Sequence, residues 1–167
     1  VVIFDKPPGI SSARAVAQVK RLLPRGVKIG HAGTLDPFAT GVLLLLIGKA
    51  TKRCEELMGA QKVYETTLKL GATTATLDPE FPETPCAVSQ PPTRQAIEKI
   101  LTAMTGVVYQ RPPAFSAMKV GGRRAYKLAR EGKVVELPAR PVRIDRIELL
   151  SYDWPLLSLR ITCGRGT

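Results

Sequence analysis

One acidic residue stands in a short segment rich in residues with special backbone geometry. Asp36 lies in the sequence Gly-His-Ala-Gly-Thr-Leu-Asp-Pro-Phe-Ala at 30–39, which Thr-Gly closes. Glycine permits backbone conformations closed to other residues, and Pro37 fixes φ directly after the acid. The apolar run at 42–47 is long enough for a buried strand. The pattern therefore predicts either a carboxylate aimed by a shaped loop or an Asp-Pro turn leading into a core strand.

Most familiar catalytic constellations are absent from the sequence. The single histidine, His31, excludes a site with several histidine ligands, and the acids are too dispersed for two-metal chemistry. There is no G-x-S-x-G elbow, no P-loop and no G-x-G-x-x-G. We therefore expect neither a metal nor a nucleotide cofactor. What remains is Asp36 as a covalent nucleophile, with an arginine nearby to keep it ionised. The sequence does not indicate which arginine.

Three further residues have side chains that suit recognition or support. Tyr64 lies on the apolar face of an alternating segment, as a core aromatic or as a ring that stacks on a base. His31 is either a hydrogen-bonding loop residue or a second stacking ring. Lys6, between a short strand and two prolines, is either a surface lysine or a brace for the Asp36 loop.

The charge of the chain is large and uneven. The 167 residues carry a formal net charge of +11. Residues 111–146 hold ten basic and three acidic side chains, a net +7, whereas residues 71–105 carry a net −2. A solvated lysine-rich surface is the simpler explanation, but clustering of this size favours a nucleic acid as partner.

Composition indicates one domain without a membrane span. The length suffices for a sizeable core, and no apolar run reaches membrane-spanning length. The three cysteines are scattered and lack C-x-x-C spacing, which predicts reduced thiols, no zinc site and a cytoplasmic location. The chain begins with Val1 and not with Met, so we expect the natural N-terminus to lie further upstream.

Periodicity and capping residues predict an α+β fold with a mixed, largely antiparallel sheet flanked by helices and loops. Ser11 or Ser12 is expected to cap the first helix, and Thr93 a later one. The expected strands span 1–4, 42–47, 62–70, 107–110, 115–120, 142–152 and 156–163. The expected helices span 12–23, 50–58, 94–105 and a basic turn at 123–131, with a loop at 72–92.

Several ordered motifs make the chain resemble the TruB-type tRNA pseudouridine synthases. The sequence at 5–12 resembles the family's D-K-P-x-G-x-[ST]-S motif. The sequence at 30–41 resembles its G-H-x-G-x-L-D-P-x-A-T-G catalytic loop, and 62–64 matches its K-x-Y strand. The sequence at 112–119 resembles P-x-x-[YF]-S-A-x-K, with a basic insertion behind it. The resemblance spans essentially the whole chain and implies the pseudouridine synthase fold.

The resemblance implies a role for each candidate residue. Asp36 would attack the target nucleotide, Tyr64 would stack on the flipped base, and His31 would fill the space that the base leaves. Lys6 would support the catalytic loop, and we count it among the substrate-binding residues. The basic insertion at 119–140 would grip the RNA; its candidate contacts are Lys119, Arg123, Arg124 and Arg130.

The implied reaction converts the uridine at position 55, in the T-loop of tRNA, to pseudouridine without a cofactor or metal. The partner would be the T-arm, and the enzyme would be a cytoplasmic monomer. Two alternatives stay open. The chain could be a non-catalytic tRNA-binding or folding module, or a guide-RNA-dependent relative of the dyskerin type. Whether attack begins at C1′ or C6 also stays open.

The sequence departs from the family pattern in two places. Ala75 stands where the family usually carries an aspartate between two threonines, and Asp78 follows. The last residues, 161–167, resemble the beginning of a motif that continues Tyr-Ile-Arg in the family, where the arginine pairs with the catalytic aspartate. We therefore expect residues 1–167 to be a catalytic domain that is incomplete at its C-terminus, and the activity of this chain alone to be uncertain.

Overall fold

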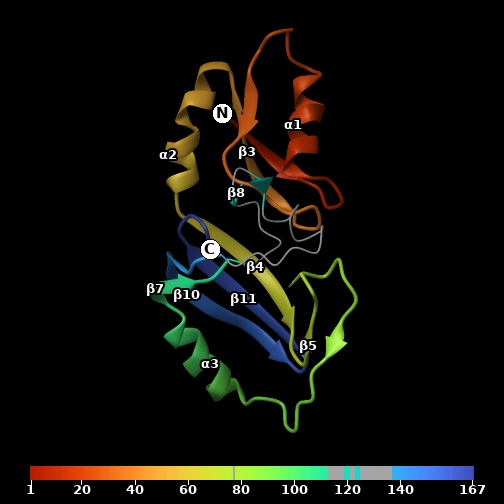
Figure 1. Ribbon diagram of the computed structural model, residues 1–167, viewed down its shortest axis with the longest axis vertical. Helices are drawn as coiled ribbons and strands as arrows, with labels where there is room; N and C mark the ends of the chain where they lie inside the picture. Colours follow the sequence, from red (N-terminus) through yellow and green to blue (C-terminus); the bar gives the residue numbers. More distant parts are fainter. Residues whose placement is uncertain (77, 113–118, 121–122, 125–136) are drawn as a thin grey trace. The chain divides into compact units, whose positions relative to one another are not determined.

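The computed structural model describes residues 1–76, 78–112, 119–120, 123–124 and 137–167. Its contacts divide the chain into two compact units, Val1–Ala60 and Gln61–Thr167 (Figure 1). Whether residues 1–167 form one catalytic domain stays a prediction.

The first unit combines a three-stranded antiparallel sheet, of order β1-β3-β2, with three short helices. Its elements are β1 (Val2–Lys6), α1 (Ser12–Lys20), β2 (Ile29–His31), β3 (Gly41–Ile47), the 3₁₀ helix η1 (Gly48–Arg53) and α2 (Cys54–Gly59). The central strand, β3, carries the run Val-Leu-Leu-Leu-Leu-Ile that the sequence predicts to be buried. Leu43 and Leu45 pack with Ala15 of α1, and Leu35 of the Asp36 loop joins the same cluster. The loop is therefore fastened to the core by an apolar side chain.

The two adjacent serines at the start of α1 have different tasks. The side chain of Ser11 accepts a hydrogen bond from the backbone N–H of Arg14 at 3.2 Å, which makes Ser11 the N-cap. Ser12 is the first helical residue and is almost fully buried. The sequence offered both as caps, and the structure assigns the cap to Ser11.

The second unit is built on a four-stranded antiparallel sheet of order β4-β11-β10-β7. These strands are β4 (Lys62–Lys69), β7 (Gly106–Gln110), β10 (Arg140–Asp153) and β11 (Leu156–Cys163). The unit also contains α3 (Arg94–Ala103) and two short strand pairs. These are β5 (Ala72–Thr73) with β6 (Thr84–Pro85), and β8 (Lys119–Val120) with β9 (Arg123–Arg124).

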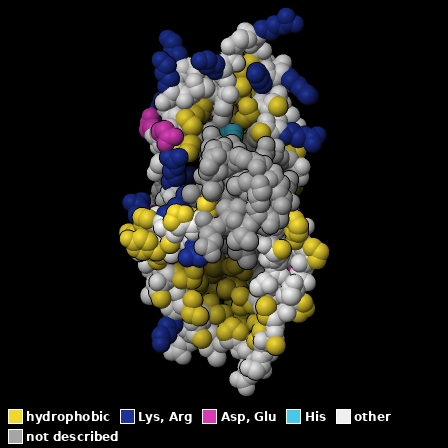
Figure 2. Space-filling model, in the orientation of Figure 1, with side chains coloured by type: hydrophobic (Ala, Val, Ile, Leu, Met, Phe, Trp, Pro, Cys, Tyr) yellow, Lys and Arg dark blue, Asp and Glu magenta, His cyan; other side chains and the backbone are white. Residues whose placement is uncertain are grey.

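Alternation separates the two faces of this sheet. Directly opposite residues of antiparallel strands share a face, so the pairing of Tyr64 with Ile161 and of Leu68 with Leu157 defines an apolar face. Ile97 and Leu101 of α3 pack with Leu157 and Leu159 of this face. Figure 2 shows apolar side chains gathered in a hollow of the second unit.

The opposite face of the same sheet is polar. Arg160 of β11 donates two hydrogen bonds to the carboxylate of Glu65 on β4, at 2.9 and 2.7 Å. These bonds raise the pKa of the Arg160 guanidinium further above its ordinary value. Thr67 and Ser158 form a hydroxyl–hydroxyl bond of 2.8 Å beside them. The predicted alternation along 62–70 is thus confirmed.

The α+β class with largely antiparallel sheets is confirmed, as are most of the expected elements. The helix expected at 50–58 begins as the 3₁₀ turn η1 before it becomes α2. β2 was not predicted, and the loop expected at 72–92 contains β5 and β6. The helical turn expected from 123 is wrong at its first two residues, which form β9; residues 125–131 lie outside the described part.

Candidate active site

Asp36 is an exposed residue on a loop whose backbone is held on both sides. Its own carbonyl accepts the N–H of Ala39 at 3.1 Å. The carbonyl of the next residue, Pro37, accepts the N–H of Gly9 at 2.8 Å and the Lys6 ammonium at 3.1 Å. The carboxylate therefore faces solvent from a backbone that cannot easily turn, which is the arrangement expected of a carboxylate aimed by its loop.

On the other side of Asp36, the hydroxyl of Ser12 binds both backbone groups of Leu35. It donates to the Leu35 carbonyl at 2.9 Å and accepts the Leu35 N–H at 2.9 Å. A hydroxyl has one proton to donate and can accept as well, so one side chain satisfies both groups. The peptide that joins Leu35 to Asp36 is thus held by a side chain of α1.

Lys6 is fully buried at the end of β1. Its Nζ donates to the carbonyls of Pro7 at 3.0 Å, Ile10 at 2.8 Å and Pro37 at 3.1 Å. An ammonium has three protons, and these three bonds use them all, which offsets part of the cost of burying its charge. These contacts tie Lys6 to the Asp36 loop, as the resemblance implies; its place in the substrate-binding set stays a prediction.

His31 ends β2 and is half-buried. Its Nδ1 lies in hydrogen-bonding contact with the carbonyl of Gly33, which requires the proton on Nδ1 because a carbonyl can only accept. This bond orients the ring. Gly33 has φ of +106°, a region that side-chain-bearing residues rarely adopt.

Among the described residues, no ion pair involves Asp36. The arginine that the sequence analysis expects beside this carboxylate is therefore not identified. Nor do the described ranges contain a cluster of three His, Cys, Asp or Glu residues suited to a metal ion.

Tyr64 belongs to the second unit, where it lies on the apolar face of β4 with 37% of its surface exposed. Leu68, two pairs along the same face, is 42% exposed. A ring in this position has both an apolar neighbourhood and an open side. That combination suits a tyrosine at the edge of a binding surface better than one enclosed in a core.

The basic candidates fall largely where only the backbone is described. Lys119 begins β8, and Arg123 and Arg124 form β9, so these three residues share one short hairpin. Arg130 lies outside the described residues. In the first unit, Figure 2 shows further Lys and Arg side chains spread over the surface.

The position of the missing aspartate lies in a loop with its own hydrogen bonds. Asp78 accepts from the hydroxyl of Thr76 at 2.9 Å and from the N–H of Glu80 at 3.0 Å. The hydroxyl of Thr74 donates to the Asp78 carbonyl at 2.8 Å. Asp78 therefore stabilises this loop, in which Ala75 contributes no carboxylate.

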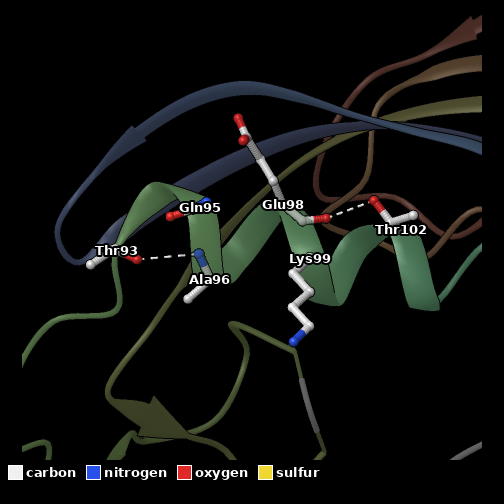
Figure 3. A pocket seen from close by; sticks show the side chains of 6 residues that line it. All are labelled: Thr93, Gln95, Ala96, Glu98, Lys99 and Thr102. Carbon is white, nitrogen blue, oxygen red and sulfur yellow. Dashed lines mark hydrogen bonds between the residues drawn. The ribbon is translucent and has the colours of Figure 1, made fainter.

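A shallow depression lies along α3, away in sequence from every candidate residue (Figure 3). Two of its lining groups are engaged within the helix: Thr93 caps the N–H of Ala96, and the hydroxyl of Thr102 donates to the Glu98 carbonyl. Its side chains do not converge on a common point, so it does not compete with the Asp36 loop as the site.

Comparisons with known proteins decide the family. The model of the TruB family pseudouridylate synthase, N-terminal domain, matches residues 20–167. The tRNA pseudouridine synthase B of Bacteroides fragilis is 44% identical over 172 residues, covering 100% of this chain and 74% of that protein. The chain belongs to the TruB family of pseudouridine synthases. Its fold class and its activity, the isomerisation of uridine to pseudouridine, follow from this membership.

Other relatives agree with the assignment. The tRNA pseudouridine synthase B of Brucella ovis is 45% identical over 167 residues, covering 99% of this chain and 51% of that protein. A chain of the Cbf5–Nop10–Gar1 crystal structure matches with a TM-score of 0.69 and 26% identity, covering 99% of this chain and 40% of that one. A chain of an H/ACA ribonucleoprotein bound to a substrate RNA shares the fold, with a TM-score of 0.67 and 24% identity. None of these matches favours the non-catalytic alternative.

Sequence reasoning missed the part played by Ser12 in this TruB family member. Two adjacent serines that follow a glycine and an apolar residue strongly indicate a helix N-cap. A cap needs only one of the two. The second serine was the available clue that another group required a hydroxyl.

Replacement of Lys6 by Met tests the buried brace. Met keeps most of the apolar stem and removes the ammonium, so the carbonyls of Pro7 and Ile10 lose their Lys6 bonds. We expect a loss of about 1–3 kcal/mol in the free energy of unfolding, measured by urea denaturation. Lys20→Met, at an exposed residue of α1, is the control and should change stability by less than about 0.5 kcal/mol. Equal losses in the two variants would contradict the brace.

Proposed function

We propose that this chain carries the catalytic loop of an enzyme that converts the T-loop uridine of tRNA to pseudouridine, with Asp36 as the nucleophile. The observation that carries the proposal is a single exposed carboxylate whose neighbouring peptides are all anchored. The relatives of 44–45% identity are named as tRNA pseudouridine synthases, which favours tRNA over a guide-RNA-dependent substrate.

The proposed reaction needs no oxidant, reductant or added group, because product and substrate are isomers. The N1–C1′ bond of the nucleotide breaks and a C5–C1′ bond forms, while the proton on C5 is lost and N1 of the uracil gains one. A carboxylate can assist by bonding covalently to the nucleotide while the base is detached and turning. Asp36 bears this role whether it attacks C1′ or C6.

The target base must leave its stack before this chemistry can begin. A stacked uridine does not expose C1′ and C5 to a side chain, and flipping costs a few kcal/mol. Tyr64 is proposed to stack on the flipped base and to assist removal of the C5 proton. His31, whose ring is oriented by Gly33, is proposed to occupy the vacated space in the loop.

Contacts with phosphates are proposed to supply the remaining affinity. The net charge of +11 suits an RNA partner, and the basic stretch at 119–140 is the candidate grip. No helix among the described residues has the length and apolar character to cross a membrane. We propose that the enzyme acts on the T-arm as a monomer in the cytoplasm.

Asp36→Asn in the full-length enzyme tests the nucleophile. The amide keeps the size of the side chain and removes its nucleophilic charge. We expect pseudouridine formation in a T-loop stem-loop to become undetectable, and the dissociation constant for tRNA to stay within about threefold. Asp5→Asn, at the edge strand β1, is the control and should retain full turnover. Turnover by Asp36→Asn at the wild-type rate would overturn the assignment.

Replacement of Arg123 and Arg124 by Ala tests the basic grip. If each contacts one phosphate, the slope of log K against log salt should become shallower by about one to two units, with weaker binding at low salt. The control pair, Arg94→Ala with Lys99→Ala, removes two exposed charges from α3 and should leave the slope unchanged. An unaltered slope in the first pair would exclude this hairpin from the RNA interface.

A further inference from the structure

We propose that Ser12 is a positioning residue for the isomerisation, holding the Asp36 carboxylate in place through the backbone of Leu35. The inference rests on the proposed role of Asp36. It assigns a positioning function to a residue that the sequence analysis offers as a helix cap and as the last residue of the motif at 5–12.

Geometry separates Ser12 from its neighbour Ser11. The Ser11 hydroxyl turns toward α1 and caps it, whereas the Ser12 hydroxyl turns toward the loop and makes two bonds of 2.9 Å to Leu35. Ser12 is 2% exposed, so water cannot readily replace its hydroxyl. Any loss of the Ser12 side chain oxygen leaves both the N–H and the carbonyl of Leu35 without these partners.

The position of Leu35 explains why this contact matters for catalysis. The peptide between Leu35 and Asp36 determines where the Asp36 Cα–Cβ bond points, and the Leu35 carbonyl belongs to that peptide. On the far side, Lys6 and Gly9 hold the carbonyl of Pro37. If the Ser12 contact is lost, the loop can pivot about the Pro37 carbonyl, and the Asp36 carboxylate then moves relative to the nucleotide.

The contact between Ser12 and Leu35 is also expected to be rigid. Ser12 stands at the first turn of α1, whose Ala15 is fully buried against Leu43 and Leu45 of β3. The Leu35 side chain packs into this same cluster. The Ser12 hydroxyl and Leu35 are thus both fixed to the same core. We therefore expect little motion at Asp36, the residue that follows Leu35.

The experiment compares Ser12→Ala, Ser12→Thr and the matched control Ser11→Ala in the full-length enzyme. Single-turnover rates of pseudouridine formation are measured beside the dissociation constant for tRNA. Misplacement of a reacting group by about 1 Å can cost about 100-fold in rate. We therefore expect Ser12→Ala to lower the rate by about 10- to 100-fold with binding unchanged within about threefold.

The two other variants separate positioning from a general loss of stability. Ser11→Ala removes the cap and should lower the melting temperature, yet keep the single-turnover rate within about twofold. Ser12→Thr retains a hydroxyl and should be distinctly faster than Ser12→Ala. Equal rates for Ser12→Ala and the wild type would overturn the inference, as would equal rates for Ser12→Thr and Ser12→Ala.

Hydrogen–deuterium exchange tests the contact independently of the chemistry. The amide of Leu35 should exchange faster in Ser12→Ala than in the wild type or in Ser11→Ala. Unchanged exchange would overturn the contact even if Asp36 is the nucleophile. Conversely, full activity of Asp36→Asn would disprove the role of Asp36 as nucleophile but would not affect the exchange result. The two experiments therefore show separately which of the two claims fails.

Discussion

The arrangement of this molecule depends on one constraint: the backbone at Asp36 is fixed while its side chain remains in solvent. The side chain of Leu35 packs on the core, and hydrogen bonds hold the backbone around it, since buried backbone groups without partners are costly. Here the partners come from the end of β1, the turn after it and the first residue of α1: Lys6 and Gly9 on one side and Ser12 on the other. Catalysis by a lone carboxylate gains most from such fixation, because the orientation is established before the substrate arrives.

Two electrostatic effects oppose each other at the Asp36 site. An exposed carboxylate repels the phosphates of the RNA that it must approach, and a chain with a net charge of +11 attracts them. All three protons of the buried Lys6 ammonium are used by carbonyls of the loop and the adjoining turn. The positive charge proposed to recruit the RNA, at 119–140, therefore lies on other residues than the ammonium that holds the loop.

The sequence predicts the class of fold better than it predicts the residues that hold the Asp36 loop. The apolar run at 42–47 records burial directly, and the period-two alternation along 62–70 records the two faces of a strand whose residues are mostly exposed, so both strands follow from pattern. The three residues of β2 have no such pattern, because they become a strand only through pairing with β3. Likewise, the burial of Lys6 and the second task of Ser12 arise from contacts across about 20 to 30 residues of chain. No local periodicity records such contacts.

Asp36→Glu in the full-length enzyme gives the most direct measurement of the central claim, that catalysis requires this carboxylate at this fixed position. Glutamate preserves the charge and the nucleophilic group and moves them outward by one methylene from an unchanged loop. The account predicts a single-turnover rate of pseudouridine formation at least about 100-fold below wild type, with tRNA binding unchanged. A rate within about threefold of the wild type would contradict it.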